Sequence, residues 1–448
     1  MLERFRDYIK NRALISPDSK VLLAVSGGVD SMVMADLFIK AGYNCAIAHC
    51  QFNLRGKESE EDEAFVRSYA QLQNIPAHLM SFDTKGAAEE RGISIQMAAR
   101  KLRYEWFTSL LDKHGFEAVA TAHHLGDVAE TMLINLTRGT GISGLHGIRS
   151  RQNRIIRPML FASREDIAGY AISENIAWRE DSSNQDTKYR RNEIRQSVLP
   201  VLKKQNPNLE QRMAVTSEKL AGAEAIVKVF VNSFYEQHCF TSTEGLIRIP
   251  LEALLATPAP ALLLHELLKK YGYAYEQMRD VLGDGVGESG RFVAAKGYRL
   301  YRDREDLILQ KEPDGTALTG ELSEEEGTQH AAGYDWEISL HPAEYFEIST
   351  DSQVAALDRD KLIFPLKIRT WKQGDRFFPL GMKRQKKLSD FMIDEKIPLY
   401  LKEKVRVVCS GDDIVWVAGY RIDHRYRLTK DTKEVYRIGI LEDYDKSI

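Results

Sequence analysis

The sequence predicts an α/β protein whose N-terminal part is a doubly wound parallel sheet. Through the first two hundred residues, short apolar runs typical of buried parallel strands alternate with longer segments whose apolar residues recur at helical spacing. The first apolar run ends in a serine–glycine–glycine turn that leads directly into a helical pattern. Repeated strand–helix units of this kind form a parallel sheet that helices cover on both faces.

The elements of this sheet follow one another without long interruptions. The predicted strands are residues 21–25, 45–48, 79–82, 118–122 and 155–160. The predicted helices are residues 30–40, 58–72, 94–114, 127–137 and 164–174. Gly42 follows the first helix as a C-terminal stop signal, and the second helix begins with an acidic turn that suits the helix dipole.

The pattern changes after Pro207. Residues 209–237 and 251–271 are predicted to be helical, and the glycines of 285–290 are predicted to form a hairpin turn before strands at 291–294 and 306–309. Residues 312–332 are polar and acidic, and are predicted to be a linker or long loop; short strands with one helix near 389–392 follow. We therefore predict three domains: an α/β domain (1–207), a mostly helical middle domain (208–332) and a small α+β domain (333–448).

Composition excludes several classes of protein. The chain has 448 residues, 43% of them apolar and 28% charged, and no apolar run long enough to span a membrane. Charged residues interrupt the first nine residues, which predicts a cytoplasmic protein rather than a secreted one. The four cysteines form no C-x-x-C pair, which disfavours zinc sites, iron–sulfur clusters and disulfides. The net charge is only −3, but residues 367–387 contain eight basic residues and one acid, a local patch suited to a phosphate backbone.

One loop predicts a phosphate site. It follows the first strand and consists of Ser26, Gly27, Gly28, Val29, Asp30 and Ser31. Paired glycines let backbone N–H groups turn inward around an anion, and the start of the next helix adds unpaired donors and a positive dipole end. An aspartate beside a polyanion is unfavourable unless it holds a magnesium ion or meets a cationic group, so Asp30 is a candidate magnesium ligand.

This hexapeptide resembles the loop of the ATP pyrophosphatases, which split ATP into AMP and pyrophosphate. Other segments resemble one family in that group, the tRNA(Ile)-lysidine synthases. They are residues 53–56, 99–104, 121–139, 157–160, 178–184 and 190–195, with 374–390 near the C-terminus. The resemblance is weak in the middle domain.

The resemblance implies a carbon–nitrogen ligase that uses ATP and Mg²⁺. Its partners would be L-lysine and a tRNA(Ile) with a CAU anticodon, whose wobble cytidine is adenylated and then converted to lysidine. The implied catalytic residues are Asp30, Arg103, His124, Asp127, Glu130 and Arg138. Among them Asp30 and Asp127 would hold the metal, Arg103 and Arg138 would contact phosphate, and Asp127, Glu130 and His124 are candidates to bind or deprotonate the lysine amine. The implied tRNA contacts are Arg190, Arg191, Arg195, Arg376, Lys383, Lys386 and Lys387. The resemblance thus makes 1–207 the catalytic domain, of the ATP-pyrophosphatase type, and 333–448 the tRNA-binding domain.

One position departs from the family pattern. The family usually has two acids followed by glutamine in its second signature, whereas this chain has Gly126, Asp127 and Val128. This puts the role of position 126 in doubt and keeps open a non-catalytic RNA-binding relative. A second alternative is a tRNA 2-thiocytidine enzyme, which the absence of paired cysteines disfavours. The sequence leaves open whether the protein is a monomer or a homodimer.

Overall fold

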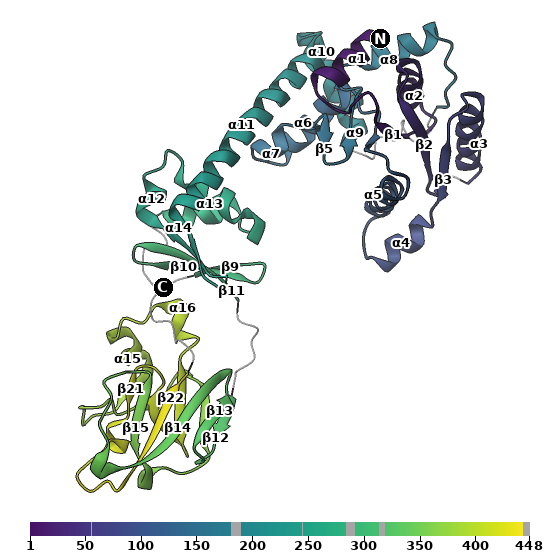
Figure 1. Cartoon of the computed structure of the whole chain (residues 1–448). Helices are drawn as coiled ribbons and strands as arrows, with labels where there is room; N and C mark the ends of the chain where they lie inside the picture. The colour runs from purple at the N-terminus through teal and green to yellow at the C-terminus, as the bar shows by residue number, and fades with distance from the viewer. Residues whose placement is uncertain (55, 181–189, 244, 284–291, 313–318, 442–448) are drawn as a thin grey trace. The chain divides into compact units, whose positions relative to one another are not determined.

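The computed structural model describes residues 1–54, 56–180, 190–243, 245–283, 292–312 and 319–441. The chain folds into two compact units, Met1–Lys228 and Val229–Ile448 (Figure 1). The predicted hairpin turn at 285–290 lies outside the described residues. Within the described residues, no helix is both long enough and apolar enough to cross a membrane.

The first unit contains the predicted doubly wound sheet. Its six strands lie in the order β3-β2-β1-β4-β6-β5, and all pairs are parallel except the edge pair β5–β6. The strands are β1 (Lys20–Ala24), β2 (Asn44–Gln51), β3 (Ala77–Ser81), β4 (Ala118–Ala120), β5 (Arg151–Gln152) and β6 (Ile155–Ile156). The strand order reverses between β1 and β4, so the loops that follow these two strands meet at the topological switch point.

Helices cover both faces of this sheet because its strands are apolar on both sides. In β1, Val21 and Leu23 pack with α2 (Val29–Ala41), α3 (Lys57–Leu72) and α8 (Arg164–Ser173), while Leu22 packs on the other face with α5 (Ile95–His114). The remaining helices of this unit are α1 (Leu2–Asn11), α4 (Thr84–Glu90), α6 (Leu125–Thr137), α7 (Ile142–Leu145), α9 (Arg190–Glu193) and α10 (Leu199–Gln205), with the π-turn η2 (Ile194–Val198) between the last two.

The second unit begins within the long helix α11 (Leu209–His238). Its helices α12 (Leu251–Leu255), α13 (Pro260–Leu268) and α14 (Tyr275–Leu282) pack on a five-stranded antiparallel sheet. That sheet has the order β7-β8-β11-β10-β9, from β7 (Phe240–Thr241), β8 (Ile247–Pro250), β9 (Phe292–Ala295), β10 (Tyr298–Asp303) and β11 (Asp306–Lys311). The single helix predicted over 251–271 is wrong. Pro258 and Pro260 interrupt it, and Pro260 begins α13 because proline suits only the first turn of a helix.

The C-terminal part of this unit is built mainly from two antiparallel sheets around one core. One has the order β12-β16-β19-β20-β21 and the other β13-β14-β22-β15. The linker predicted over 312–332 is wrong in its described part, because β12 (Thr319–Leu322) and β13 (Gly327–Ala331) are edge strands. Edge strands expose polar side chains, and only Leu322 and Ala331 of these two are buried, so no apolar pattern marked them.

The other strands of these sheets are β14 (Tyr334–Pro342), β15 (Val354–Asp358), β16 (Leu366–Thr370), β19 (Arg406–Ser410), β20 (Asp413–Val417), β21 (Arg421–Ile422) and β22 (Glu434–Ile440). A small hairpin, β17 (Arg376–Phe377) with β18 (Lys386–Lys387), and the helices α15 (Leu388–Asp394) and α16 (Leu399–Lys402) complete the C-terminal part.

Candidate active site

The glycine-rich loop joins β1 to α2 in the conformation that its glycines allow. Gly27 has a φ of +95°, a backbone conformation that other residues rarely adopt, and Gly28 is the N-cap of α2. A Cβ on Gly27 would lie 3.7 Å from Phe65 and Val66 of α3, so the loop packs closely on that helix. In the first turn of α2, the N–H of Ser31 donates to the carbonyl of Gly28 at 3.1 Å. The N–H groups of Val29 and Asp30 precede it and have no acceptor within the helix, so they suit an anion.

Two serines shape this loop from within. The buried hydroxyl of Ser31 donates to the carbonyl of Gly28 at 2.8 Å and accepts from the backbone N–H of Ser26 at 3.1 Å. Ser26 itself is exposed, and its hydroxyl lies 3.4 Å from the N–H of Gly28. Ser31 therefore holds the loop closed, and Ser26, whose hydroxyl lies 3.2 Å from that of Ser31, is the exposed hydroxyl of the loop.

Arg179 secures the loop from a distant segment, a contact that sequence reasoning did not assign. Its backbone N–H donates to the carbonyl of Gly27 at 2.9 Å. Its guanidinium bonds Asp62 at 2.5 Å and Glu61 at 2.8 Å, both on α3. In the sequence, Arg179 stood out through its place in the segment 178–184, which carries part of the family resemblance. Residues 181–184 of that segment lie outside the described residues.

Asp30 lies half-buried in the first turn of α2, with its Oδ1 atom buried. Its Oδ1 has no hydrogen-bond partner within the described part of the chain. Burial raises the pKa of Asp30 above 3.8, and the nearby carboxylate of Asp127 adds to this, while His124 and Arg164 oppose it. An unsatisfied, buried carboxylate oxygen beside a phosphate loop is suited to a divalent cation. Arg164 was not among the predicted site residues.

The loop after β4 starts α6 with a reciprocal cap. The Nδ1 of His124 accepts from the N–H of Gly126 at 3.1 Å, and the Oδ2 of Asp127 accepts from the N–H of His124 at 2.9 Å. Since Nδ1 is an acceptor, a neutral His124 carries its proton on Nε2. The adjacent His123 lies 3.0 Å from the hydroxyl of Thr121, and burial lowers the pKa of His123 to about 4, so it is neutral near pH 7.

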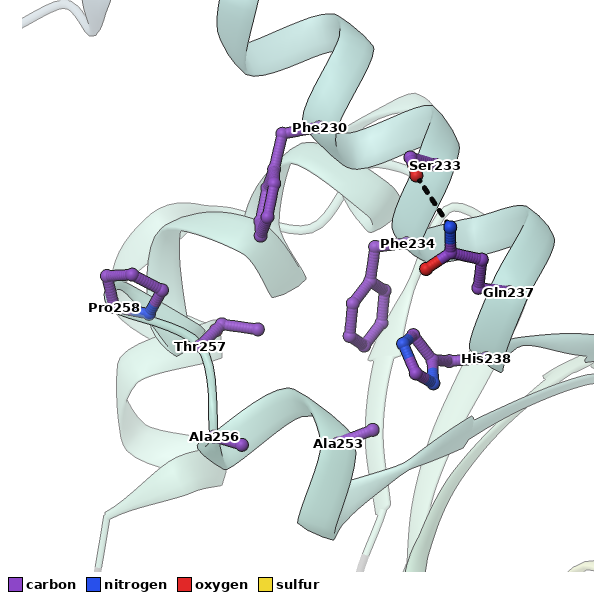
Figure 2. Close-up of a pocket in the computed structure, with 9 residues that line it drawn as sticks. All are labelled: Phe230, Ser233, Phe234, Gln237, His238, Ala253, Ala256, Thr257 and Pro258. Atoms are coloured by element: carbon purple, nitrogen blue, oxygen red, sulfur yellow. Dashed lines mark hydrogen bonds between the residues drawn. The ribbon is translucent and has the colours of Figure 1, made fainter.

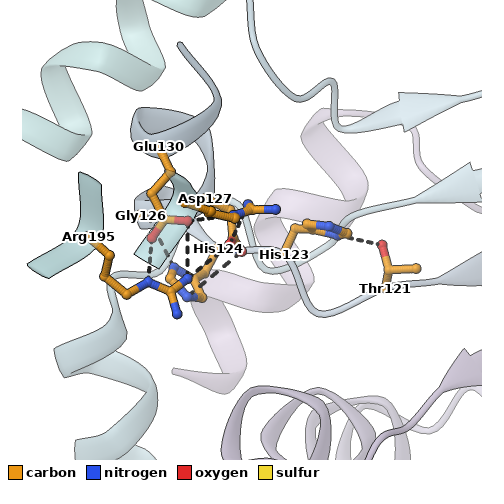
Figure 3. Close-up of polar contacts among 8 residues, drawn as sticks. Thr121, His123, His124, Gly126, Asp127, Glu130 and Arg195 are labelled. Carbon is orange, nitrogen blue, oxygen red and sulfur yellow. Dashed lines mark hydrogen bonds and ion pairs between the residues drawn. The ribbon is translucent and has the colours of Figure 1, made fainter. Parts of the chain in front are cut away.

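Two arginines pair with the carboxylates of α6, and Figure 3 labels one of them, Arg195, beside Asp127 and Glu130. Arg191 bonds Asp127 at 2.8 Å and Glu130 at 2.7 Å. Arg195 bonds Glu130 at 2.5 Å and lies 3.6 Å from Asp127. The Glu130 side chain is only 1% exposed, and its two cations satisfy its charge. Burial would raise the pKa of Asp127, but the charges of His124 and Arg191 outweigh burial and lower it.

The structure brings most of the predicted catalytic residues together, with two exceptions. The electrostatic environment of Asp30 includes His124, Asp127 and Arg195. Arg103 lies on α5 with its guanidinium 5.0 Å from the centre of the Phe52 ring. Arg138 caps the C-terminal end of α6, and at about 1.5 Å per residue it lies roughly 16 Å along the helix from Asp127.

The residues predicted to contact tRNA fall into two different environments. Arg191 and Arg195 belong to the network just described, whereas Arg190 is exposed. In the second unit, Arg376, Lys383 and Lys387 are exposed on or beside the β17–β18 hairpin, together with Arg384. Lys386 pairs with Asp394 of α15. Residues 367–387 form a basic tract whose only acid is Asp375. Arg369 bonds Asp375 at 2.7 Å, so the charge of this carboxylate is already neutralised.

A separate pocket of about 350 Å³ lies in the second unit, between the end of α11 and the α12 segment. Figure 2 shows Phe230, Phe234 and His238 on one side and Thr257 with Pro258 on the other. The rings of Phe234 and His238 lie 4.8 Å apart. The lining residues include no lysine, arginine or carboxylate, so this pocket does not suit a polyphosphate.

Comparison with known proteins finds relatives along nearly the whole chain. Residues 1–202 match the PP-loop domain, 242–312 the TilS substrate binding domain and 366–438 the TilS substrate C-terminal domain. The chain is 40% identical to the tRNA(Ile)-lysidine synthase of Parabacteroides distasonis, over 98% of this chain and 100% of the relative. It is 38% identical to that of Bacteroides thetaiotaomicron, over 97% and 98%. Among solved structures, the U34-tRNA thiolase NcsA from Methanococcus maripaludis matches with a TM-score of 0.42 and 19% identity, over 49% of this chain and 77% of that one.

Proposed function

Because this chain belongs to the tRNA(Ile)-lysidine synthase family, we propose that it is the ligase that joins L-lysine to the wobble cytidine of a tRNA(Ile) with a CAU anticodon. The cytidine O2 attacks the α-phosphorus of ATP and pyrophosphate leaves. The ε-amine of lysine then attacks C2, the C2–O bond to AMP breaks, and the amine loses a proton. The products are lysidine, AMP and pyrophosphate, and the protein works in the cytoplasm.

The observation that carries this proposal is the meeting of the glycine-rich loop with the start of α6 at the switch point of the sheet. The loop and the first turn of α2 hold the pyrophosphate through backbone N–H groups, with Ser26 adding a hydroxyl. Arg195 neutralises charge beside Asp30. It is better placed for this than Arg138, which caps the far end of α6. Arg103 remains a proposed phosphate contact from α5.

Magnesium fits at Asp30. When bound, the cation would neutralise polyphosphate charge, and it usually takes one or two protein carboxylates together with phosphate oxygens and water. The buried, unpartnered Oδ1 of Asp30 is such a ligand. The described residues contain no group of three His, Cys, Asp or Glu side chains that could hold a metal alone, which agrees with a cation bound together with ATP. Asp127 is less suited, because both of its oxygens already have partners.

The carboxylates of α6 are the proposed site for the lysine amine. Asp127 and Glu130 already hold two guanidinium groups, so this pair is suited to cationic ligands. A lysine ammonium would replace one of these arginine contacts rather than add a third charge. Asp127 is the first proposed acceptor of the amine proton, and His124 is the second, because its Nδ1 could accept the proton only by giving up the bond from the Gly126 N–H.

The cysteines support ligation over thiolation. A persulfide mechanism needs a thiolate, but burial raises the pKa of Cys45 to about 11 and that of Cys50 to about 12. Cys239 and Cys409 also have pKa values raised by burial.

The decisive measurement is pyrophosphate release by the purified protein with ATP, L-lysine and the CAU-anticodon tRNA(Ile), followed by mass spectrometry of the wobble nucleoside. We expect release that depends on the tRNA and a nucleoside heavier by one lysine less one water. Release that is equally fast without tRNA, or a product carrying sulfur, would contradict the proposal. A tRNA with a CAG anticodon is the matched control.

A further inference from the structure

Position 126 lies between the side chains of His124 and Glu210, and His124 leaves no room for a Cβ there. A Cβ on Gly126 would lie 2.9 Å from Cε1 of His124 and 3.4 Å from Oε1 of Glu210. The first distance is closer than real Cβ atoms come, and His124 is buried with only 3% of its surface exposed. Any side chain at 126 would therefore displace the imidazole that caps α6.

The carboxylate on the other side of this space comes from a distant part of the chain. Glu210 lies in the first turn of α11, is only 6% exposed, and bonds Lys203 of α10 at 2.8 Å. A buried carboxylate needs such a cation. Burial would lower the pKa of Lys203, but its bond to Glu210 raises it, so the lysine stays charged. Glu210 thus brings a carboxylate, paired with Lys203, close to the first turn of α6.

We propose that Glu210 is a positioning residue of this active site: it supplies from α11 the carboxylate that the chain lacks at position 126. Its carboxylate borders the space at Gly126 that the imidazole of His124 borders too, and so helps to keep the imidazole turned toward Asp127, whose Oδ2 lies 3.8 Å from Nε2. Its charge favours the N-terminal end of α6, where the glycine weakens the helix. The effect of the residue at position 126 on the active site therefore depends on the residue at position 210, and the reverse.

This inference rests on the proposed function, so its test uses the same reaction. The kcat and the KM for ATP are measured by pyrophosphate release for the wild type, Gly126→Asp, Glu210→Ala and the double variant. Gly126→Asp alone places two carboxylates against each other and pushes His124. In the double variant, the space that Glu210 leaves gives room both to the aspartate and to the imidazole that its Cβ displaces. We expect both single variants to lose about tenfold or more in kcat and the double variant to exceed both.

Two further variants separate positioning from folding. Glu210→Gln keeps the shape and removes the charge, and is expected to lower kcat about tenfold while the KM for ATP stays within about twofold. Glu165→Gln is the matched control, because Glu165 also contacts Lys203, at 3.4 Å, but is exposed. It should leave kcat unchanged.

The outcomes are distinct. A double variant whose kcat is at or below that of Glu210→Ala would overturn the coupling, and so would an unchanged kcat in Glu210→Gln. If the wild type releases no pyrophosphate with tRNA and lysine, the proposed function fails instead, and the coupling is then judged from the melting temperatures. In that case a Tm of the double variant above those of both single variants supports it, and a lower or equal Tm overturns it.

Discussion

The Nε of Arg195 lies 2.5 Å from Oε1 of Glu130, and the carboxylate is almost completely buried. The two residues are 65 positions apart in the chain, so this ion pair joins the segment after α9 to the middle of α6. Arg191 provides the second cation for the same carboxylate. The pair therefore links the stability of the first unit to the geometry of its active site.

The first prediction concerns this pair. Arg195→Ala leaves Glu130 buried with one cation instead of two, which we expect to cost about 2 kcal/mol. In a unit of this size, such a loss of stability lowers the melting temperature of the first unit by roughly 5 °C, which calorimetry measures. Arg190→Ala, an exposed neighbour, is the control and should change Tm little. Equal shifts in the two variants would show that the buried pair contributes no special stability.

Asp30→Asn should separate stability from activity. The pKa of Asp30 is raised, so between pH 3.8 and that raised value the folded protein binds more protons than the unfolded chain. The stability that this group contributes is therefore lost as the pH rises through its folded pKa. Asparagine has no charge to bury, so the variant should melt higher than wild type at pH 7, with the difference shrinking toward pH 4. Its pyrophosphate release should fall about 100-fold or more.

Asp36→Asn is the control for that measurement. Asp36 lies on the same helix, but it bonds Tyr170 at 2.9 Å and Lys40 at 3.0 Å. Removing its charge should lower Tm slightly and preserve activity. If Asp30→Asn instead melts below wild type at pH 7, the Asp30 carboxylate is stabilised by contacts other than a bound cation.

The loop conformation predicts a specific effect of a methyl group at Gly27. Gly27 lies just before α2 and Gly42 is the C-cap of α2. Gly27→Ala forces alanine to a φ of +95°, and Gly42→Ala forces it to a φ of +83°. Both should cost roughly 1 kcal/mol of stability. Only Gly27→Ala should raise the KM for ATP, by about tenfold, because a small displacement of the loop misplaces its N–H donors. A similar KM in the two variants would mean that the loop does not set ATP affinity.

The basic tract beside the β17–β18 hairpin should bind the tRNA backbone. Lys383→Ala with Arg384→Ala should weaken tRNA binding at low salt and reduce the slope of log Kd against log salt by about 1 for each phosphate that the variant no longer neutralises. Lys430→Ala with Lys433→Ala removes the same charge from other exposed positions of this unit. If both double variants weaken binding equally, only net charge matters and the tract has no special role.

Several parts of the fold could be predicted from local patterns alone. The parallel sheet, its helices and the glycine-rich loop were confirmed, because buried parallel strands are continuous apolar runs and the loop needs glycine at a left-handed position. The errors have local causes too. Two prolines divided the helix predicted over 251–271, and the polar edge strands β12 and β13 lack the apolar alternation by which strands are recognised.

By itself, the sequence determined the phosphate loop, the place of Asp30 in it and the family of the chain. Only the tertiary structure decided which distant residues complete the site. Arg191 and Arg195 were predicted to contact tRNA, yet they lie on the carboxylates of α6, and Glu210 lies where a side chain at 126 would point. The physical reason is that a turn or a helix depends on neighbouring residues, and therefore leaves a periodic pattern. A buried ion pair depends only on where two charges meet after the chain has folded.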